Sequence, residues 1–202
     1  MNSFDNIPQE MKELPQWVAR VDKIPINPNS LYGAKSTDKT SWGTFEQAKA
    51  AIGKKAKMKA VQGKECNGIG FVLSAPYCGI DIDHCFNPET GEWSKEALDI
   101  IKNMNSYTEV SPSGTGVHIF YKNDGNTHTE WNKKKPIDSI QHLEMYQTDR
   151  IFTVTGEMFG GYTSLNERSV AADCIYRGYM QEDEQPESKP FKATTPTQLL
   201  RR

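Results

Sequence analysis

Asp81 and Asp83 interrupt an otherwise apolar run in the sequence YCGIDIDHCFN, residues 77–87. Side chains in an extended strand alternate between two faces, so Ile80 and Ile82 would face the core and both aspartates the opposite side. A rise of about 3.3 Å per residue would leave the carboxylates roughly 7 Å apart. Such a pair repels unless cations neutralise it, and hard oxygen ligands suit Mg²⁺ or Mn²⁺. An exposed hairpin with ordinary surface aspartates is the alternative.

A third acid, Glu144, lies between Leu143 and Met145 in the sequence HLEMYQTDRIFTVTG, residues 142–156. The same alternation places Glu144 on the polar face of an apolar strand. Three carboxylates could hold two metal ions, and Arg150, which opens the next predicted strand, could neutralise phosphate charge. A structural Glu–Arg pair across a hairpin would explain the same two residues.

The sequence SPSGTGVHIF, residues 111–120, predicts a glycine-rich turn followed by a strand. Gly114 and Gly116 allow the backbone to approach a ligand closely, and successive N–H groups in such a turn can hold phosphate oxygens. His118, in the strand, could donate a hydrogen bond to a phosphate. A tight hairpin with a structural histidine is the alternative. The motif is neither a Walker A loop nor a dinucleotide loop, because it lacks the Lys-Ser/Thr pair and no helix follows it.

These candidate residues must be positioned by the predicted strands and helices of the chain. Hydrophobic periodicity and capping residues predict a strand at 16–21, a strand, turn and second strand at 106–122, and two strands within 140–159. They also predict a hairpin at 68–83 that turns at Ala75-Pro76, and helices at 44–62, 94–104 and 164–180. Loops are predicted at 22–42 and 124–136. Several strands are adjacent in sequence, which favours an α+β fold around a mixed, mostly antiparallel sheet flanked by helices.

The bulk composition narrows the function classes. The chain has 202 residues and a net charge of −2, so no global basic field indicates a nucleic-acid binder, although a local basic groove would still serve. Apolar runs are too short to span a bilayer, and the N-terminus lacks the pattern of a secretory signal. The four cysteines include no CxxC pair. Zinc at Cys78, His84 and Cys85 is less favoured than free thiols in a reducing cytoplasm.

Taken together, the motifs resemble the archaeo-eukaryotic primase superfamily. Their order is Asp-x-Asp on a strand, Ser-Gly-x-Gly-x-His, an apolar-flanked Glu, and RIFTVTG. The resemblance is closest to the primase-polymerase (prim-pol) domains at the N-terminus of phage and plasmid replication proteins. It extends upstream through WVARVDKIPINPNSLYGAKSTDKTSWGTFEQA and covers roughly residues 15–178. We therefore expect residues 1–180 to form a primase-polymerase catalytic domain and residues 181–202, rich in acid, proline, serine and threonine, to be a flexible linker toward a further C-terminal region.

The resemblance implies roles for individual residues. The catalytic set would be Asp81, Asp83, Glu144 and His118, with the three acids holding Mg²⁺ or Mn²⁺. The incoming nucleotide would be bound by Ser113, Gly114, Gly116, His118, Arg150, Tyr146 and Lys35. In this set Ser113 and His118 would contact phosphates, and Tyr146 would pack on the sugar. Lys23, Lys35 and Lys39 would touch phosphate or template.

The function implied by the resemblance is template-directed nucleotidyl transfer, as a primase or DNA polymerase in phage or plasmid replication. Its partners would be nucleoside triphosphates, a single-stranded DNA template and primer, and a helicase module in the full-length protein, with no membrane, in the cytoplasm of a bacterial or archaeal host. The basic stretches at 53–59 and 131–135 are candidate template contacts, with Trp131 stacking on a base. A divalent-metal nuclease and a non-catalytic nucleic-acid-binding module are the alternatives. A nicking enzyme with a tyrosine nucleophile usually needs a paired-histidine motif, and the sequence contains none.

Overall fold

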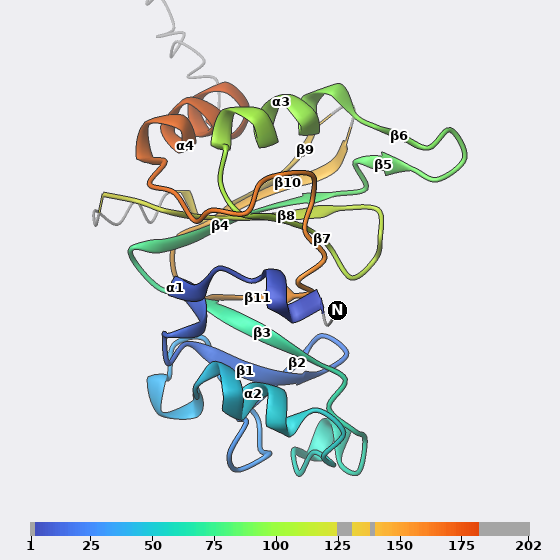
Figure 1. Cartoon of the computed structure of the whole chain (residues 1–202), viewed down its shortest axis with the longest axis vertical. Coiled ribbons are helices and arrows are strands. Elements are labelled where there is room, and N and C mark those ends of the chain that lie inside the picture. The colour runs from blue at the N-terminus through green and yellow to red at the C-terminus, as the bar shows by residue number, and fades with distance from the viewer. Residues whose placement is uncertain (1–2, 125–130, 138–139, 182–202) are drawn as a thin grey trace, which may run out of the picture.

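The computed structural model describes residues 3–124, 131–137 and 140–181, which fold around two antiparallel β-sheets (Figure 1). The five-stranded sheet has the order β7-β8-β4-β10-β9 and the four-stranded sheet the order β11-β3-β1-β2. The strands are β1 (Trp17–Val21), β2 (Ile24–Ile26), β3 (Gly68–Leu73), β4 (Tyr77–Asp83), β5 (Phe86–Asn87), β6 (Glu92–Trp93), β7 (Thr108–Val110), β8 (Val117–Lys122), β9 (Lys133–Ile137), β10 (Ile140–Tyr146) and β11 (Arg150–Val154). The α-helices are α1 (Gln9–Lys12), α2 (Phe45–Ala51), α3 (Lys95–Met104) and α4 (Ser169–Ile175). The predicted α+β class is confirmed.

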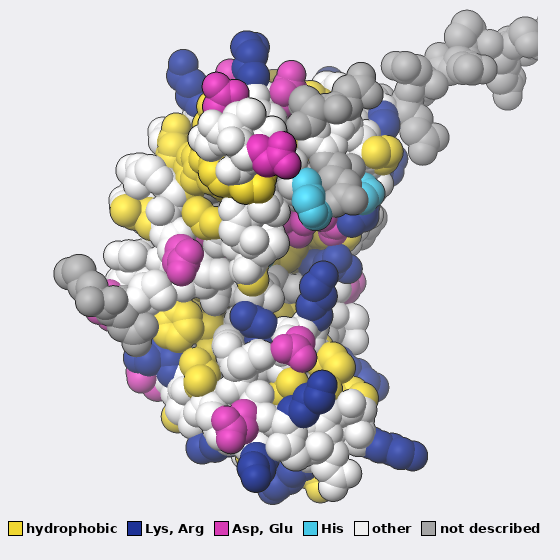
Figure 2. All heavy atoms as spheres, turned by 90° about the vertical axis from the view of Figure 1, so that its right-hand side faces the viewer, with side chains coloured by type: hydrophobic (Ala, Val, Ile, Leu, Met, Phe, Trp, Pro, Cys, Tyr) yellow, Lys and Arg dark blue, Asp and Glu magenta, His cyan; other side chains and the backbone are white. Residues whose placement is uncertain are grey.

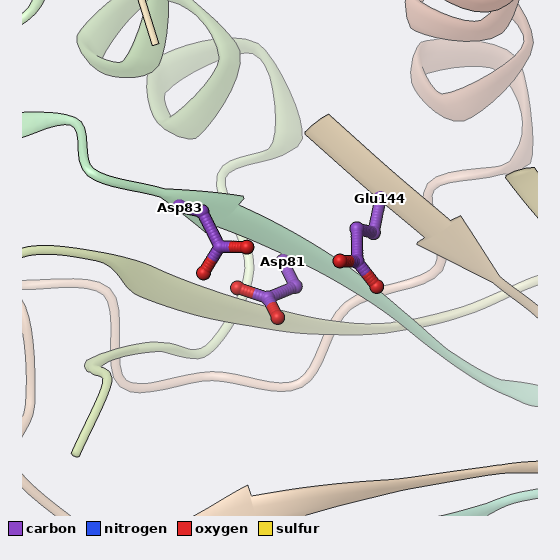
Figure 3. A group of neighbouring side chains, drawn as sticks. All are labelled: Asp81, Asp83 and Glu144. Atoms are coloured by element: carbon purple, nitrogen blue, oxygen red, sulfur yellow. The ribbon is translucent and has the colours of Figure 1, made fainter. Parts of the chain in front are cut away.

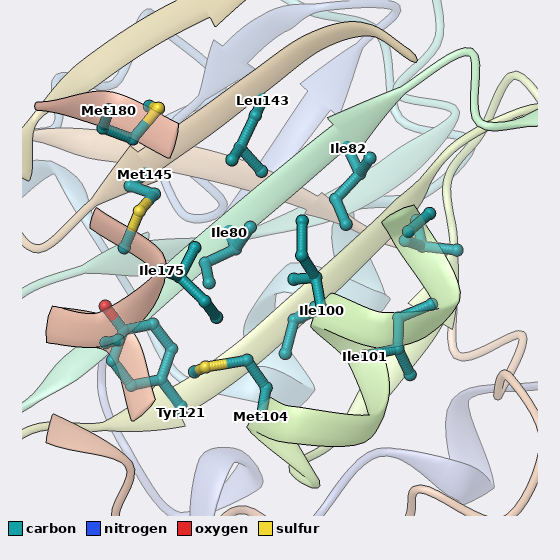
Figure 4. Close-up of a cluster of buried hydrophobic side chains, with 14 of the residues drawn as sticks. Ile80, Ile82, Ile100, Ile101, Met104, Tyr121, Leu143, Met145, Ile175 and Met180 are labelled. Carbon is teal, nitrogen blue, oxygen red and sulfur yellow. The ribbon is translucent and has the colours of Figure 1, made fainter. Parts of the chain in front are cut away.

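Helices α3 and α4 cover one face of the five-stranded sheet, and the four-stranded sheet lies on its other side with α2 beyond it (Figure 1). Under α3 and α4, Ile80 and Ile82 are fully buried in a core of aliphatic side chains (Figure 4), as the alternation in β4 predicts. Helix α3 begins where predicted, because the Ser94 side chain accepts a hydrogen bond from the N–H of Ala97. Phe71, Phe120 and Phe152 make edge-to-face contacts that join the two sheets.

The expected hairpin at 68–83 is wrong, because β3 and β4 enter different sheets. Strand β3 pairs with β1 and β11, whereas β4 pairs with β8 and β10. The predicted neighbours β10 and β11 are divided in the same way. Strands β3, β4 and β11 therefore find their hydrogen-bonded partners far along the chain, whereas β10 pairs with the adjacent β9 as well as with the distant β4. As a consequence, β4 and β10 lie in one sheet and face β3 and β11 in the other sheet, with no hairpin pairing between them.

The helix predicted at 44–62 is too long. Helix α2 ends at Ala51, because Ile52 has an extended backbone (φ −60°, ψ 134°) and Gly53 adopts φ +82°. The chain then forms a loop closed by backbone hydrogen bonds, which include one of 2.8 Å from the N–H of Ala56 to the carbonyl of Lys64. Lys54, Lys55 and Lys57 therefore lie on a loop and not on a helix face, and Lys59 begins a single 3-10 turn, Lys59–Val61.

Two other boundaries differ from the prediction. Residues 133–137, predicted as part of a loop, form strand β9 against β10. The helix predicted at 164–180 begins only at Ser169 and continues as a π-helical turn at Tyr176–Met180. Residues 125–130 of the predicted loop and, apart from Gln181, the predicted linker at 181–202 lie outside the described residues.

All four cysteines are free, and burial raises the pKa of both Cys78 and Cys85 to about 12. Both thiols are buried, and neither belongs to a group of three or more potential metal ligands among the described residues. Among the described helices none is both long and apolar enough to cross a membrane.

Candidate active site

Three carboxylates from two neighbouring strands converge on the face of the five-stranded sheet that is turned away from α3 and α4. Asp81 and Asp83 come from β4 and Glu144 from β10, where Glu144 stands directly opposite Asp81. One carboxylate oxygen from each residue lies within 4.8 Å of the others (Figure 3). The sequence predicted this cluster from strand alternation, and the antiparallel pairing of β4 with β10 supplies the register that sequence does not contain.

The surroundings of Asp81 disfavour its charged form. Burial raises the pKa of Asp81 to about 6; nearby His118 opposes this shift, whereas Asp83 and Glu144 add to it. The buried Oδ1 of Asp81 has no hydrogen-bond partner among the described residues. A buried carboxylate oxygen without a partner is costly unless a cation meets it. The all-oxygen set of ligands and this unsatisfied oxygen fit Mg²⁺ or Mn²⁺.

Glu144 is held by three neighbours. Lys134 Nζ and Arg150 Nη2 each donate to a different carboxylate oxygen, the latter at 3.1 Å, and the Tyr146 hydroxyl donates at 2.9 Å. Burial alone would raise the pKa of Glu144, but the hydrogen bonds from Lys134 and Tyr146 and the nearby positive charges outweigh it and lower this pKa. Glu144 is therefore ionised at neutral pH and fixed in place.

Lys134 was missed as a site residue. It lies on β9 opposite Glu144, and its Nζ is also 3.6 Å from Oδ2 of Asp83. The sequence marks Lys134 only as part of a basic run, and that run shows no apolar alternation from which a strand could be predicted.

The glycine-rich turn lies between β7 and β8. Ser113 is exposed there, and its hydroxyl is 2.9 Å from that of Ser111. Gly114 adopts φ +75°, a conformation that favours glycine. A Cβ on Gly116 would lie 2.7 Å from the carbonyl oxygen of Ile82, so only glycine lets this turn pack against the end of β4.

His118 is buried beside Asp81 and lies between the glycine-rich turn and the carboxylate cluster. Its Nδ1 lies 2.9 Å from the carbonyl oxygen of Thr153, and its Nε2 lies 3.7 Å from Oδ1 of Asp81. Burial acts to lower the pKa of His118, but the acidic neighbours Glu109 and Asp81 and the Thr153 carbonyl outweigh it and raise this pKa. The acidic neighbours therefore make the protonated imidazole easier to form than burial alone would allow.

A cleft of about 810 Å³ runs between the two sheets. The five-stranded sheet and its β7–β8 turn contribute Asp81, Asp83, Glu144, His118, Ser113 and Lys134, while Arg20, Lys23, Lys35 and Arg150 come from the other sheet and its loops. Figure 2 shows acidic side chains recessed near the middle of the molecule, with Lys and Arg side chains below them. An acidic wall thus faces a basic one, an arrangement suited to metal ions and phosphates together.

Most predicted site residues meet in this cleft, but some do not. Gly114, Gly116 and Tyr146 are not among the described residues that line it. The sugar contact expected for Tyr146 stays a prediction; in the structure the Arg150 guanidinium lies over the Tyr146 ring, 4.5 Å from the ring centre. The expectation that Trp131 stacks on a base is wrong, because its side chain is 4% exposed and stacks on Tyr176.

The comparisons with known proteins bear on this geometry. No family model matches the chain. A DNA primase-polymerase of the Nitratiruptor phage NrS-1 is 35% identical over 158 residues, which cover 75% of this chain. The chain spans only about 20% of the length of that relative. This similarity confirms the resemblance indicated by the motifs: over three quarters of its length the chain is similar to a phage primase-polymerase.

Proposed function

We propose that this domain catalyses template-directed nucleotidyl transfer, as a DNA primase or DNA polymerase. The observation that carries the proposal is the cleft itself, in which three clustered carboxylates, one buried and two partly buried, face Arg and Lys side chains of the other sheet, and one Asp81 oxygen has no hydrogen-bond partner among the described residues. The substrates would be nucleoside triphosphates and a primer on a single-stranded DNA template. The relative's name supports this activity class.

In the proposed reaction a primer 3′-hydroxyl attacks the α-phosphate in line and pyrophosphate leaves. Asp81, Asp83 and Glu144 would hold Mg²⁺ or Mn²⁺, which when bound would stabilise the attacking and leaving oxygens. Lys134 and Arg150 lie beside these carboxylates and balance their charge. Substrate binding would therefore introduce phosphate charge at a place where cationic groups are already oriented.

The triphosphate would lie between the turn and the basic wall. His118 and Ser113 both line the cleft, with His118 Nε2 on the side of Asp81, and both side chains would donate to phosphate oxygens. Arg150 has about half of its side chain exposed, which leaves guanidinium N–H groups for a phosphate. Lys35 would neutralise charge from the opposite wall.

Single-stranded template would be held mainly by the loop after α2. Lys54, Lys55, Lys57, Lys59 and Lys64 are all exposed in this loop, which we call the lysine loop, and Tyr32 beside it is 58% exposed with Lys57 Nζ 6.0 Å from its ring centre. Clustered lysines next to an exposed ring suit a nucleic-acid backbone and its bases. A helicase module elsewhere in the full-length protein and a place in the host cytoplasm remain expectations from the resemblance.

The test is incubation of end-labelled DNA, primed and unprimed, with Mg²⁺ or Mn²⁺, with and without dNTPs or NTPs. Lengthening that requires nucleotides supports the proposal, and the unprimed arm separates priming from extension. Shortening without nucleotides would instead indicate a metal-dependent nuclease. Binding with no change of length would indicate a nucleic-acid-binding module.

A further inference from the structure

Glu109 is a buried carboxylate that the proposed mechanism does not use. It lies on β7 with 0% exposure, and its oxygens accept hydrogen bonds from the N–H groups of Thr155 (2.9 Å) and Gly156 (3.0 Å) and from the Tyr107 hydroxyl (3.0 Å). Glu109 is not among the described residues that line the cleft, so it has no route to substrate. Burial of a carboxyl group is costly unless its oxygens are hydrogen-bonded in this way.

The same carboxylate lies behind His118. Oε1 of Glu109 is 3.6 Å from Nδ1 of His118, and that nitrogen is 2.9 Å from the Thr153 carbonyl oxygen. A carbonyl only accepts hydrogen bonds, so Nδ1 must carry a proton and donate it. The other nitrogen, Nε2, is then the one that faces Asp81 and the cleft.

We propose that Glu109 is a positioning residue for His118. Glu109 fixes the segment that follows β11, and with it the Thr153 carbonyl, while its charge lies against the Nδ1 side of the ring. The Glu109 carboxylate and the Thr153 carbonyl both lie on the Nδ1 side, so they orient the ring with Nε2 toward the nucleotide. This inference rests on the proposed function, since it assigns His118 to the triphosphate, but the geometry around Nδ1 does not depend on it.

A purely structural role makes a different prediction. If Glu109 only joins the two sheets, its loss should lower activity by the same factor with or without His118. If it acts through His118, removing His118 should leave Glu109 with little further effect. A double-mutant cycle separates the two roles.

The cycle uses Glu109→Gln, His118→Ala and the double variant in steady-state primer extension, with kcat and KM measured for the nucleotide. We expect Glu109→Gln to lower kcat/KM by about tenfold or more, chiefly through KM, and by less than about twofold in the His118→Ala background. Tyr107→Phe is the matched control, because it removes a donor to Glu109 without altering the charge behind His118. It should change kcat/KM by less than about twofold. Equal factors in both backgrounds, or wild-type kinetics of Glu109→Gln, would overturn the proposal.

A second readout needs no catalysis. Imidazole ¹⁵N shifts of His118 in the wild-type protein should show a protonated Nδ1, and they should move in Glu109→Gln but not in Tyr107→Phe. An unprotonated Nδ1 in the wild type would overturn the proposal even if Glu109→Gln did not fold. If the wild type incorporated no nucleotide, the proposed function would fail, while these spectra would still decide whether Glu109 positions the ring.

Discussion

Asp81→Asn should stabilise the metal-free protein, although it should abolish the activity. Burial raises the pKa of Asp81 to about 6 from an ordinary value of 3.8, so ionised Asp81 is disfavoured by the fold. Between these two pKa values the folded state binds more protons than the unfolded state, and stability therefore falls as pH rises through this window. A difference of about two pKa units corresponds to about 3 kcal/mol, which is the upper limit of what an uncharged isostere regains above pH 6.

The assay is urea unfolding with EDTA present at pH 4 and at pH 8. With an m value of about 1–3 kcal/mol/M, the midpoint of Asp81→Asn at pH 8 should rise by up to about 1–3 M, and the gain should shrink toward zero at pH 4. Added Mn²⁺ should stabilise the wild type but have little effect on the variant, because the metal needs the ionised carboxylate. If Asp81→Asn were destabilised at pH 8, or if its effect were independent of pH, the electrostatic reasoning for this site would be refuted.

Three further predictions test Lys134 beside the three carboxylates, the packing of the glycine-rich turn, and template binding by the lysine loop. Lys134→Met removes an ammonium group that competes with a divalent ion for the carboxylates. The Mn²⁺ concentration that gives half-maximal activity should therefore fall severalfold, and an unchanged concentration would count against this competition. Gly116→Ala should destabilise the fold by roughly 1–3 kcal/mol in thermal unfolding, because its Cβ would overlap backbone, whereas Gly161→Ala, with open space around it, should be neutral. In the lysine loop, Lys57→Glu should reduce the slope of the logarithm of the single-stranded DNA binding constant against the logarithm of salt concentration by about one, whereas Lys95→Glu on α3 should leave this slope unchanged. Equal effects of the two substitutions would contradict template binding at the lysine loop.

Local patterns were enough to predict the strands that carry the acids. The alternation of Ile80 and Ile82 with two aspartates fixed which face each residue occupies, and the Ser94 cap placed the start of α3. Those inferences depend only on neighbours within a few residues. They therefore stay correct regardless of which sheet the strand joins.

Pairing between distant strands was not predictable in the same way. Strand β4 follows β3 closely, yet both of its edges are hydrogen-bonded to the distant strands β8 and β10, so a hairpin was inferred wrongly. Glu109 escaped attention because β7 is buried on both sides, and period-two alternation cannot then separate a buried acid from a surface one. Lys134 escaped because its strand is nearly all polar.

The central claim is that the three carboxylates support nucleotide incorporation, and the most direct measurement is primer extension by the double variant Asp81→Ala plus Asp83→Ala. Both side chains project from the non-core face of β4, so the variant should keep the wild-type fold by circular dichroism. It should incorporate no nucleotide with either Mg²⁺ or Mn²⁺. A control variant, Asp99→Ala on the exposed face of α3, should extend primers at the wild-type rate. Normal extension by the folded double variant would contradict the account.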